Sequence, residues 1–306
     1  MRGIGRIGRM RHKADASAFR VRVGGHTVEV SHPDKVLFPD DGITKRDLAE
    51  YYRRIAPKIL PFLKDRPLSL QRFPDGIGWG FYEKKAPDYF PKWFERVRVK
   101  VKEGGSQQQL MCNNAASLVY LADQACITPH PWLSRKGRLD YPDRMIFDLD
   151  PPGDDFAPAR AAAHVLRDVL EKAGLRPFVM STGSRGVHVV TSLPGNERYD
   201  DVRARARELA EQAAAREPSD LTVEPRKDAR KGRTFVDYLR NAYGQTSVPP
   251  YAVRARKGAP VAVPLRWTEL DSPGLTARSY NIKNVFGRLK SVTNPWSAFA
   301  GRARSL

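Results

Sequence analysis

Apolar segments of two different periods alternate in the second half of the chain, and their order restricts the possible folds. Residues 159–173 and 201–216 carry apolar side chains at helical spacing, and Gly174 after the first segment is a typical helix end. Residues 234–239 (TFVDYL) predict a strand. Four other short runs also predict strands: 144–150 (RMIFDLD), 178–181, 187–192 and 221–224. The order strand, helix, strand, strand, helix, strand predicts a ferredoxin-like β-α-β-β-α-β unit, with residues 234–239 beside it.

The first half of the chain predicts a smaller module of helices and strands. Residues 19–30 (FRVRVGGHTVEV) alternate around Gly24-Gly25, which is typical of a hairpin. Thr44, with Asp47 three residues later, is a helix-start signal. Prolines at positions 57 and 61 leave the end of that helix open. The expected fold class is α+β, with the ferredoxin-like unit packed against an N-terminal α/β module.

The charge of the chain indicates a polyanionic partner. Fifty-three Lys and Arg against thirty-four Asp and Glu leave a net charge of +19. Nucleic acid is the usual partner of so basic a protein, although the Arg-rich composition of a GC-rich genome is an alternative explanation. The chain has no long apolar run and no secretory signal, so we expect a cytoplasmic protein without a membrane segment. Two cysteines are too few for a disulfide framework or a zinc site.

Asp148 and Asp150 stand at the end of the expected strand 144–150, directly before two prolines. Residues i and i+2 of a strand point to the same face, so these two carboxylates lie side by side and repel each other. A hard divalent cation such as Mg²⁺ or Mn²⁺ offsets that repulsion, because it prefers carboxylate oxygens. The alternative is a solvated strand edge at which arginines pair with both side chains.

Asp237 is the second acidic position, because it shares a face of the expected strand 234–239 with Phe235 and Leu239. A charge on a packed face must be paired or bind a metal. Three carboxylates on neighbouring strands suit a two-metal displacement at phosphorus, in which one metal activates a 3′-hydroxyl and the other holds a triphosphate. A structural salt bridge is the alternative for Asp237 alone.

The turn 181–186 (STGSRG) and the basic residues around Asp237 form the remaining candidate site. The turn can present backbone N–H groups and Arg185 to an anion, and His188 follows it; a buried core histidine is the alternative for His188. Aromatic residues between positions 73 and 94 lie beside lysines and could stack on bases, although most are expected in the core. Basic residues that could neutralise a triphosphate or a template, or form only a solvated charge run, are Lys227, Arg230, Lys231, Arg233, Arg254 and Arg256.

The motifs FDLDPP, STGSRGVH and FVDY, in this order, resemble the polymerase domain of bacterial DNA ligase D. This family belongs to the archaeo-eukaryotic primase superfamily and serves non-homologous end joining. The resemblance runs from Val28 to Trp296. Lysine is common in the family where this chain has Arg185, and serine where it has Thr182. The resemblance implies a primase-like catalytic core and a nucleoside triphosphate substrate.

The resemblance also implies roles for individual residues. Asp148, Asp150 and Asp237 would hold the catalytic metals, typically manganese. Lys35 and Lys45 would grip the 5′-phosphate of a recessed DNA end. Phe81 or Tyr82 would stack on the template base. The residues implied to contact the nucleotide are His130, Thr182, Ser184, Arg185, His188, Lys227, Arg230 and Arg254.

On this basis we expect four parts in the chain. They are a basic flexible arm over residues 1–18, a DNA-end-binding module over 19–135, a primase-type catalytic core over 136–296 and a tail over 297–306. The expected function is template-dependent extension and gap filling at DNA ends, with ribo- or deoxynucleotides as substrates and with Ku and a ligase as partners at the nucleoid. The chain has no K-x-D-G adenylation motif, so we expect no ligase activity of its own.

Two other functions stay open. The shared core could support a primase that starts chains without a primer, and products formed without a 3′-hydroxyl would reveal it. A catalytically inactive end-binding module that recruits a ligase is the second alternative, but such a module gains nothing from three clustered carboxylates. A metal nuclease is disfavoured, because hydrolysis does not need a basic pocket of triphosphate size.

Overall fold

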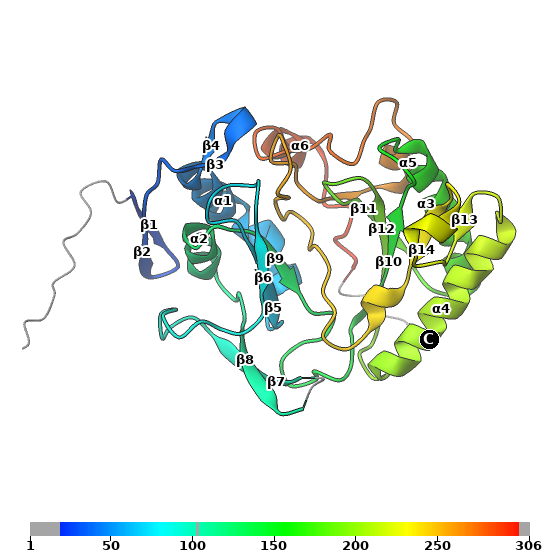
Figure 1. Cartoon of the computed structure of the whole chain (residues 1–306), viewed down its shortest axis with the longest axis horizontal. Coiled ribbons are helices and arrows are strands. Elements are labelled where there is room, and N and C mark those ends of the chain that lie inside the picture. Colours follow the sequence, from blue (N-terminus) through cyan, green and yellow to red (C-terminus); the bar gives the residue numbers. More distant parts are fainter. Residues whose placement is uncertain (1–18, 102–103, 300–306) are drawn as a thin grey trace, which may run out of the picture.

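The computed structural model describes residues 19–101 and 104–299, and its centre is a six-stranded mixed sheet (Figure 1). The strand order is β13-β14-β10-β12-β11-β15, in which only the β13–β14 pair is parallel. The bounds of the strands are β10 (Arg144–Asp150), β11 (Phe178–Ser181), β12 (Val187–Ser192), β13 (Leu221–Thr222), β14 (Thr234–Asp237) and β15 (Val263–Leu265). The expected class of mixed helices and strands is confirmed.

The sheet departs from a plain ferredoxin-like order in the position of β14. In the plain order the fourth strand of the unit, here β13, pairs with the first, here β10. Instead β14 lies between them and pairs with both. The strand expected over 234–239 ends at Asp237, because Leu239–Asn241 forms a 3₁₀ turn, and β13 is two residues shorter than expected. Leu239 therefore does not continue the face of Asp237, which corrects that part of the prediction.

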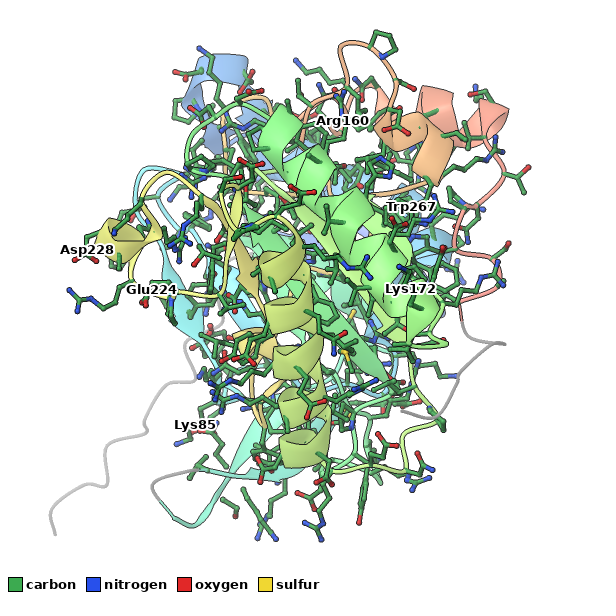
Figure 2. The ribbon with its side chains drawn as sticks, turned by 90° about the vertical axis from the view of Figure 1, so that its right-hand side faces the viewer. Lys85, Arg160, Lys172, Glu224, Asp228 and Trp267 are labelled. Carbon is green, nitrogen blue, oxygen red and sulfur yellow. The ribbon has the colours of Figure 1, made fainter. Side chains whose placement is uncertain are left out.

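Two helices cover one face of the sheet. The helices α3 (Ala157–Lys172) and α4 (Tyr199–Arg216) lie beside each other across this face, with charged side chains directed outward (Figure 2). Each begins two residues earlier than expected. Leu166, Val169 and Leu170 of α3 are buried as predicted, whereas Val165 is half-buried. The opposite face of the sheet is directed toward the N-terminal part of the chain.

The N-terminal part is built around two helices and several short strands. The expected hairpin is present as β1 (Phe19–Val23) and β2 (His26–Val30). The helix α1 (Lys45–Leu63) begins with the predicted capping box of Thr44 and Asp47. It continues through both prolines, because ten of its side chains, spread over its whole length, are buried in the core. The other elements are β3 (Val36–Phe38), β4 (Ile43–Thr44), β5 (Leu68–Arg72), β6 (Phe81–Glu83), β7 (Arg96–Lys100), β8 (Ser106–Leu110), α2 (Ala115–Asp123) and β9 (Cys126–Pro131).

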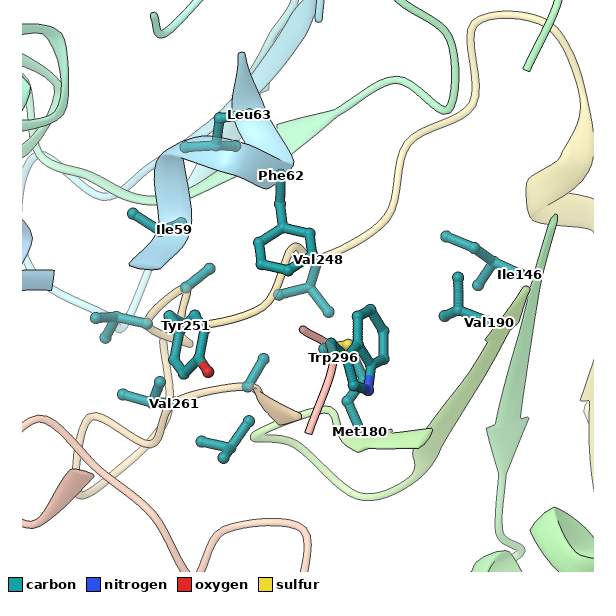
Figure 3. Close-up of a cluster of buried hydrophobic side chains, with 14 of the residues drawn as sticks. Ile59, Phe62, Leu63, Ile146, Met180, Val190, Val248, Tyr251, Val261 and Trp296 are labelled. Carbon is teal, nitrogen blue, oxygen red and sulfur yellow. The ribbon is translucent and has the colours of Figure 1, made fainter. Parts of the chain in front are cut away.

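The C-terminal part of the chain returns to the N-terminal part. The segment between β14 and β15 passes between the sheet and the N-terminal elements, and α5 (Trp267–Leu270) and α6 (Val285–Ser291) follow it (Figure 1). Buried apolar side chains from Val21 to Phe299 form one continuous cluster across both parts. Figure 3 shows part of it, where Phe62 of α1 approaches Val248 and Trp296. The division at residue 135 stays a prediction.

The two ends of the chain only partly fall within the description. The arm expected over residues 1–18 and the end of the tail, residues 300–306, lie outside the described residues. Phe299 is buried against Trp296 and Phe62, and the tail boundary at residue 297 stays a prediction. Among the helices of the described ranges, none is long and apolar enough to cross a membrane.

Candidate active site

The register of the central strand places the predicted acidic residues together. On β10, Asp148 lies directly opposite Asp237 of β14 on one side and His188 of β12 on the other. Directly opposed residues of antiparallel strands share a face of the sheet, and Asp150 is two residues further along β10 on that face. Asp150 lies opposite Phe235. The structure thus brings the three predicted carboxylates to one face, which is the face away from α3 and α4.

A cavity of about 140 Å³ lies over this face and is lined by residues from both parts of the chain. Its lining residues are Tyr82, His130, Asp148, His188, Arg240, Thr246, Ser247, Val248 and Arg254. Tyr82 and His130 come from β6 and β9 of the N-terminal part, whereas the others come from the sheet and the segment that follows β14. Two arginines and two histidines beside a carboxylate make this a site for a ligand with several negative charges.

The pKa values of the three carboxylates are shifted in different directions. Burial raises the pKa of Asp150 and of Asp237 above the ordinary value, and the charge of Asp148 adds to the rise in both. Burial acts on Asp148 in the same direction, but the nearby His188, together with the charges of Arg240 and Arg254, outweighs it and lowers the pKa. Asp150 and Asp237 therefore have too little positive charge near them to offset burial and the repulsion from Asp148.

The two histidines of the cavity have different surroundings. His188 Nε2 lies 3.4 Å from Asp148 Oδ1, and its buried Nδ1 has no hydrogen-bond partner among the described residues. Burial and the neighbouring charges of Arg254 and Arg240 lower the pKa of His130 to about 3. His130 is therefore neutral at pH 7 and can act as a hydrogen-bonding group, but not as a cation.

The turn between β11 and β12 is fixed by its own hydrogen bonds. The Thr182 hydroxyl donates to the carbonyl of Gly186 at 3.0 Å and accepts from the N–H of Ser184 at 3.3 Å. A Cβ on Gly186 would overlap the carbonyl of Leu149, so only glycine lets the turn approach β10 this closely. Arg185 is half-buried, and its charge acts on Asp150. The nucleotide contacts of Thr182, Ser184 and Arg185 stay predictions; in this structure the Thr182 hydroxyl is engaged within the turn.

The predicted basic residues divide between the cavity and the surface. Arg254 lines the cavity and donates from Nη1 to the carbonyl of Thr182 at 2.9 Å. Arg230 stacks on the ring of Phe235 at 4.0 Å and so stands beside Asp150. Lys227 is exposed at the surface and does not line the cavity.

The predicted DNA-contacting residues lie at the side of the N-terminal part. Tyr82 is 57% exposed at the mouth of the cavity, and its ring lies 5.5 Å from that of His130, whereas Phe81 is half-buried. The Lys35 ammonium is exposed and lies 2.9 Å from Asp75. Lys45, in contrast to Lys35, is buried: its side chain is only 9% exposed, and its ammonium lies 3.5 Å from Asp123. Burial lowers the pKa of Lys45, and its role in gripping phosphate stays a prediction.

Sequence reasoning missed Arg240, which stands in the 3₁₀ turn directly after β14. Its Nε lies 3.6 Å from Asp237 Oδ2, and its charge helps to lower the pKa of Asp148. The expected strand over 234–239 concealed it, because a strand would have carried residue 240 away from residue 237. The only signal was the spacing of three residues between an acid and a base.

A buried network of hydroxyl groups holds the wall that carries Arg254. The Tyr52 hydroxyl donates to the carbonyl of Ile127 and accepts from the N–H of Val253 at 3.2 Å. The Thr128 hydroxyl donates to the carbonyl of Val253 at 2.6 Å. These bonds tie α1, β9 and the segment after β14 together, and β9 carries His130.

The carboxylate oxygens of Asp148, Asp150 and Asp237 are ligands that a hard divalent cation prefers, but these oxygens do not converge on one point. Within residues 19–101 and 104–299, no three Asp, Glu, His or Cys side chains converge as a metal shell. Asp148, Asp150 and Asp237 supply carboxylate oxygens on one face, and the raised pKa values of the last two favour a nearby cation.

Comparison with known proteins identifies the family. Residues 44–296 match the family model described as LigD, primase-polymerase domain. The chain is 32% identical over 299 residues to the multifunctional non-homologous end joining protein LigD of Pseudomonas aeruginosa, covering 94% of this chain and 34% of that protein. It is 31% identical over 270 residues to the bifunctional non-homologous end joining protein LigD of Bacillus subtilis, covering 87% of this chain and 43% of that protein. The chain thus spans about a third to two fifths of these relatives.

A solved structure shares the fold. The polymerase domain of Mycobacterium tuberculosis ligase D, in complex with DNA, superposes with a TM-score of 0.83 at 29% identity, covering 90% of this chain and 99% of that one. The family model covers most of the described residues, including β10, β12 and β14 with their carboxylates and His188. The chain belongs to the family of LigD primase-polymerase domains.

Proposed function

We propose that this chain is a primase-type nucleotidyltransferase that extends and fills gaps at DNA ends, directed by a template, during non-homologous end joining. The observation that carries the proposal is the register of β10, which sets Asp148 between Asp237 and His188 beneath a cavity that holds Arg240 and Arg254. Acidic groups for metal and basic groups for triphosphate are the two requirements of phosphoryl transfer.

In this proposal Asp148, Asp150 and Asp237 hold Mn²⁺ or Mg²⁺, which when bound neutralises the charge that develops on the phosphates. Arg254 and Arg240 bind and orient the triphosphate through their guanidinium groups. His188, whose Nε2 faces Asp148, leaves its Nδ1 free for a hydrogen bond to the ligand; Nδ1 accepts when the ring carries one proton and donates when it carries two. Neutral His130 contributes a hydrogen bond without adding charge.

The DNA contacts in the proposal lie outside the cavity. Tyr82, exposed at the mouth, stacks on a base of the template, and Lys35 binds a 5′-phosphate. The similar Mycobacterium tuberculosis polymerase domain is a complex with DNA, which supports DNA as the partner, and the names of the LigD relatives support end joining as the process. Ku and a DNA ligase are the proposed partners at nucleoid DNA. This chain carries no adenylation motif for sealing a nick itself.

Primer extension on a gapped duplex with a 5′-phosphate tests the proposal. The assay uses Mn²⁺ or Mg²⁺, with ribo- or deoxynucleotides, and compares the wild type with Asp148→Asn and Asp237→Asn. Loss of one group that stabilises the charge of the transition state lowers the rate by about 10²–10³-fold, so we expect at least this loss in both variants. Asp168→Asn, the same substitution on the exposed face of α3, is the matched control and should extend like the wild type.

The outcomes separate the alternatives. Extension that is lost in both site variants and retained in the control supports the polymerase. Products formed when the primer is left out would favour the primer-independent primase. No extension by the wild type, with binding to gapped DNA retained, would refute the polymerase and favour the end-binding module.

A further inference from the structure

A second and larger cavity, of about 570 Å³, lies at the other end of β10 from the candidate active site. Its lining includes Lys58 and Phe62 of α1, Arg144 at the start of β10, and Ser192 at the end of β12. Arg144 is four residues before Asp148 on the same face, so the two Cα atoms are about 13 Å apart along the strand. Ile146 lies between them in the sequence of β10 and is paired with Val190 of β12; both are buried apolar side chains (Figure 3). The cavity is therefore separate from the candidate active site.

The charged residues in and next to the wall of this cavity carry more positive than negative charge. The Asp143 carboxylate accepts hydrogen bonds from Arg66, from Arg135 Nε at 2.9 Å and from Arg144 Nε at 3.2 Å. Three guanidinium groups around one carboxylate leave a local charge of +2, and the exposed Lys58 adds to it at the rim. Burial, with a smaller contribution from the charges of Arg144 and Arg135, lowers the pKa of Arg66 to about 9.

Arg144 has donor groups that no described residue uses. Its side chain is 5% exposed, and it lines the cavity. Its Nε donates to Asp143, but no described residue accepts a hydrogen bond from its Nη1 or Nη2. Arg135 likewise donates from Nε and Nη1 and leaves Nη2 without a described acceptor. At the cavity wall these Nη groups are free to donate to an external acceptor.

We propose that this cavity is a second, non-catalytic site that binds a phosphate group, carried by a free nucleotide or by a DNA strand. A phosphate dianion matches the local charge of +2, and its several oxygens can accept from Arg144 and Arg135 together. The cavity is about four times as large as the one over Asp148, so it has room for more than the phosphate itself.

The test follows one resonance on the wall of the cavity. Trp296 lines it, and its indole N–H donates to the carbonyl of Val179 at 3.0 Å. The chain has five tryptophans, so the indole region of a ¹⁵N–¹H spectrum is simple, and Trp296→Phe assigns the peak. Inorganic phosphate and pyrophosphate are titrated into the whole chain in EDTA, with chloride at equal ionic strength as the reference. ADP and a 5′-phosphorylated oligonucleotide then distinguish the two sources of the phosphate.

The expected result is a saturable shift of the Trp296 indole peak whose apparent Kd rises at least about tenfold in Arg144→Gln. Because Arg144 is buried and its loss can disturb folding, the double variant Lys58→Gln/Arg135→Gln at the rim should give the same rise. Arg205→Gln on α4, of similar exposure to Arg135, is the control and should leave the Kd unchanged. A Trp296 peak that does not move, or a shift that the rim variants leave intact, would overturn the proposal. Neither result depends on primer extension, so the proposed polymerase is tested separately.

Discussion

Replacement of Asn241 tests most directly how β10 and β14 are held in the register that sets Asp148 opposite Asp237. It follows β14 in the 3₁₀ turn and is fully buried. Its amide Nδ2 donates to the carbonyls of Ile146 at 2.7 Å and Tyr238 at 2.8 Å, and its Oδ1 accepts from the N–H of Ile146 at 2.9 Å. The side chain thus pairs with both backbone groups of Ile146 and continues the β10–β14 ladder after the backbone of β14 has turned away.

Asn241→Leu keeps the approximate shape of the side chain and removes all three hydrogen bonds. The N–H and C=O of Ile146 are then buried without partners, and each such group costs about 1–3 kcal/mol. We therefore expect the free energy of unfolding to fall by about 2–6 kcal/mol, a large part of the roughly 5–15 kcal/mol that stabilises a typical domain. Asp237, four residues earlier, should also lose its position, so primer extension should fall even where the variant is folded.

Urea unfolding, followed by circular dichroism, measures the first effect, and primer extension well below the unfolding midpoint measures the second. Asn284→Leu is the matched control, because Asn284 makes two comparable side-chain hydrogen bonds while exposed, so water can replace them. We expect it to cost less than about 1 kcal/mol. If Asn241→Leu were no more destabilising than Asn284→Leu, the proposed extension of the ladder would have no energetic role.

Three further predictions concern the turn, the cavity and the buried ion cluster. Gly186→Ala should destabilise the chain and reduce primer extension, because the new Cβ overlaps the Leu149 carbonyl. Gly153 has open space around it, so Gly153→Ala should leave both the urea midpoint and primer extension unchanged. Arg240→Gln should raise the KM for the nucleotide more than Arg226→Gln at the exposed surface does, and equal KM values in steady-state kinetics would remove Arg240 from the site. Burial raises the pKa of Asp143, but the charges of Arg144 and Arg66 outweigh it and hold this pKa below its ordinary value near 3.8. Ionised Asp143 therefore stabilises the fold above pH 3.8, and this stabilisation is lost on further acidification. Asp143→Asn should therefore flatten the dependence of the urea midpoint on pH between about 5 and 2, and an unchanged slope would contradict the assignment.

Local patterns in the sequence were sufficient for most of the elements. Strand alternation placed Asp148 and Asp150 on one face, and the Thr44–Asp47 spacing located the start of α1, because both depend on neighbouring residues only. The position of β14 between β10 and β13 depends on pairing across the sheet, which no local pattern encodes. For the same reason no local pattern could predict that Asp237 lies directly opposite Asp148.

The residues that complete the site were harder to predict. Arg240 lines the cavity because β14 ends at Asp237 and the chain turns there. Lys45 was predicted to grip a 5′-phosphate, and its burial beside Asp123 was not predicted. Both outcomes depend on tertiary contacts between segments distant in the sequence. The motif-based resemblance located the family and the acidic residues, while the depth at which each side chain lies had to come from the structure.

The hydroxyl network around Val253 has a consequence for attempts to divide this chain. Tyr52 and Thr128 belong to the first half and Val253 to the second, and the wall that carries Arg254 is held by bonds that cross between them. A fragment ending near residue 135 and a fragment beginning there would each lack part of the cavity, so neither should bind nucleotide when expressed alone. Mixed together, the two should reassemble more completely when nucleotide is present, because a ligand that contacts both pieces favours their association by mass action.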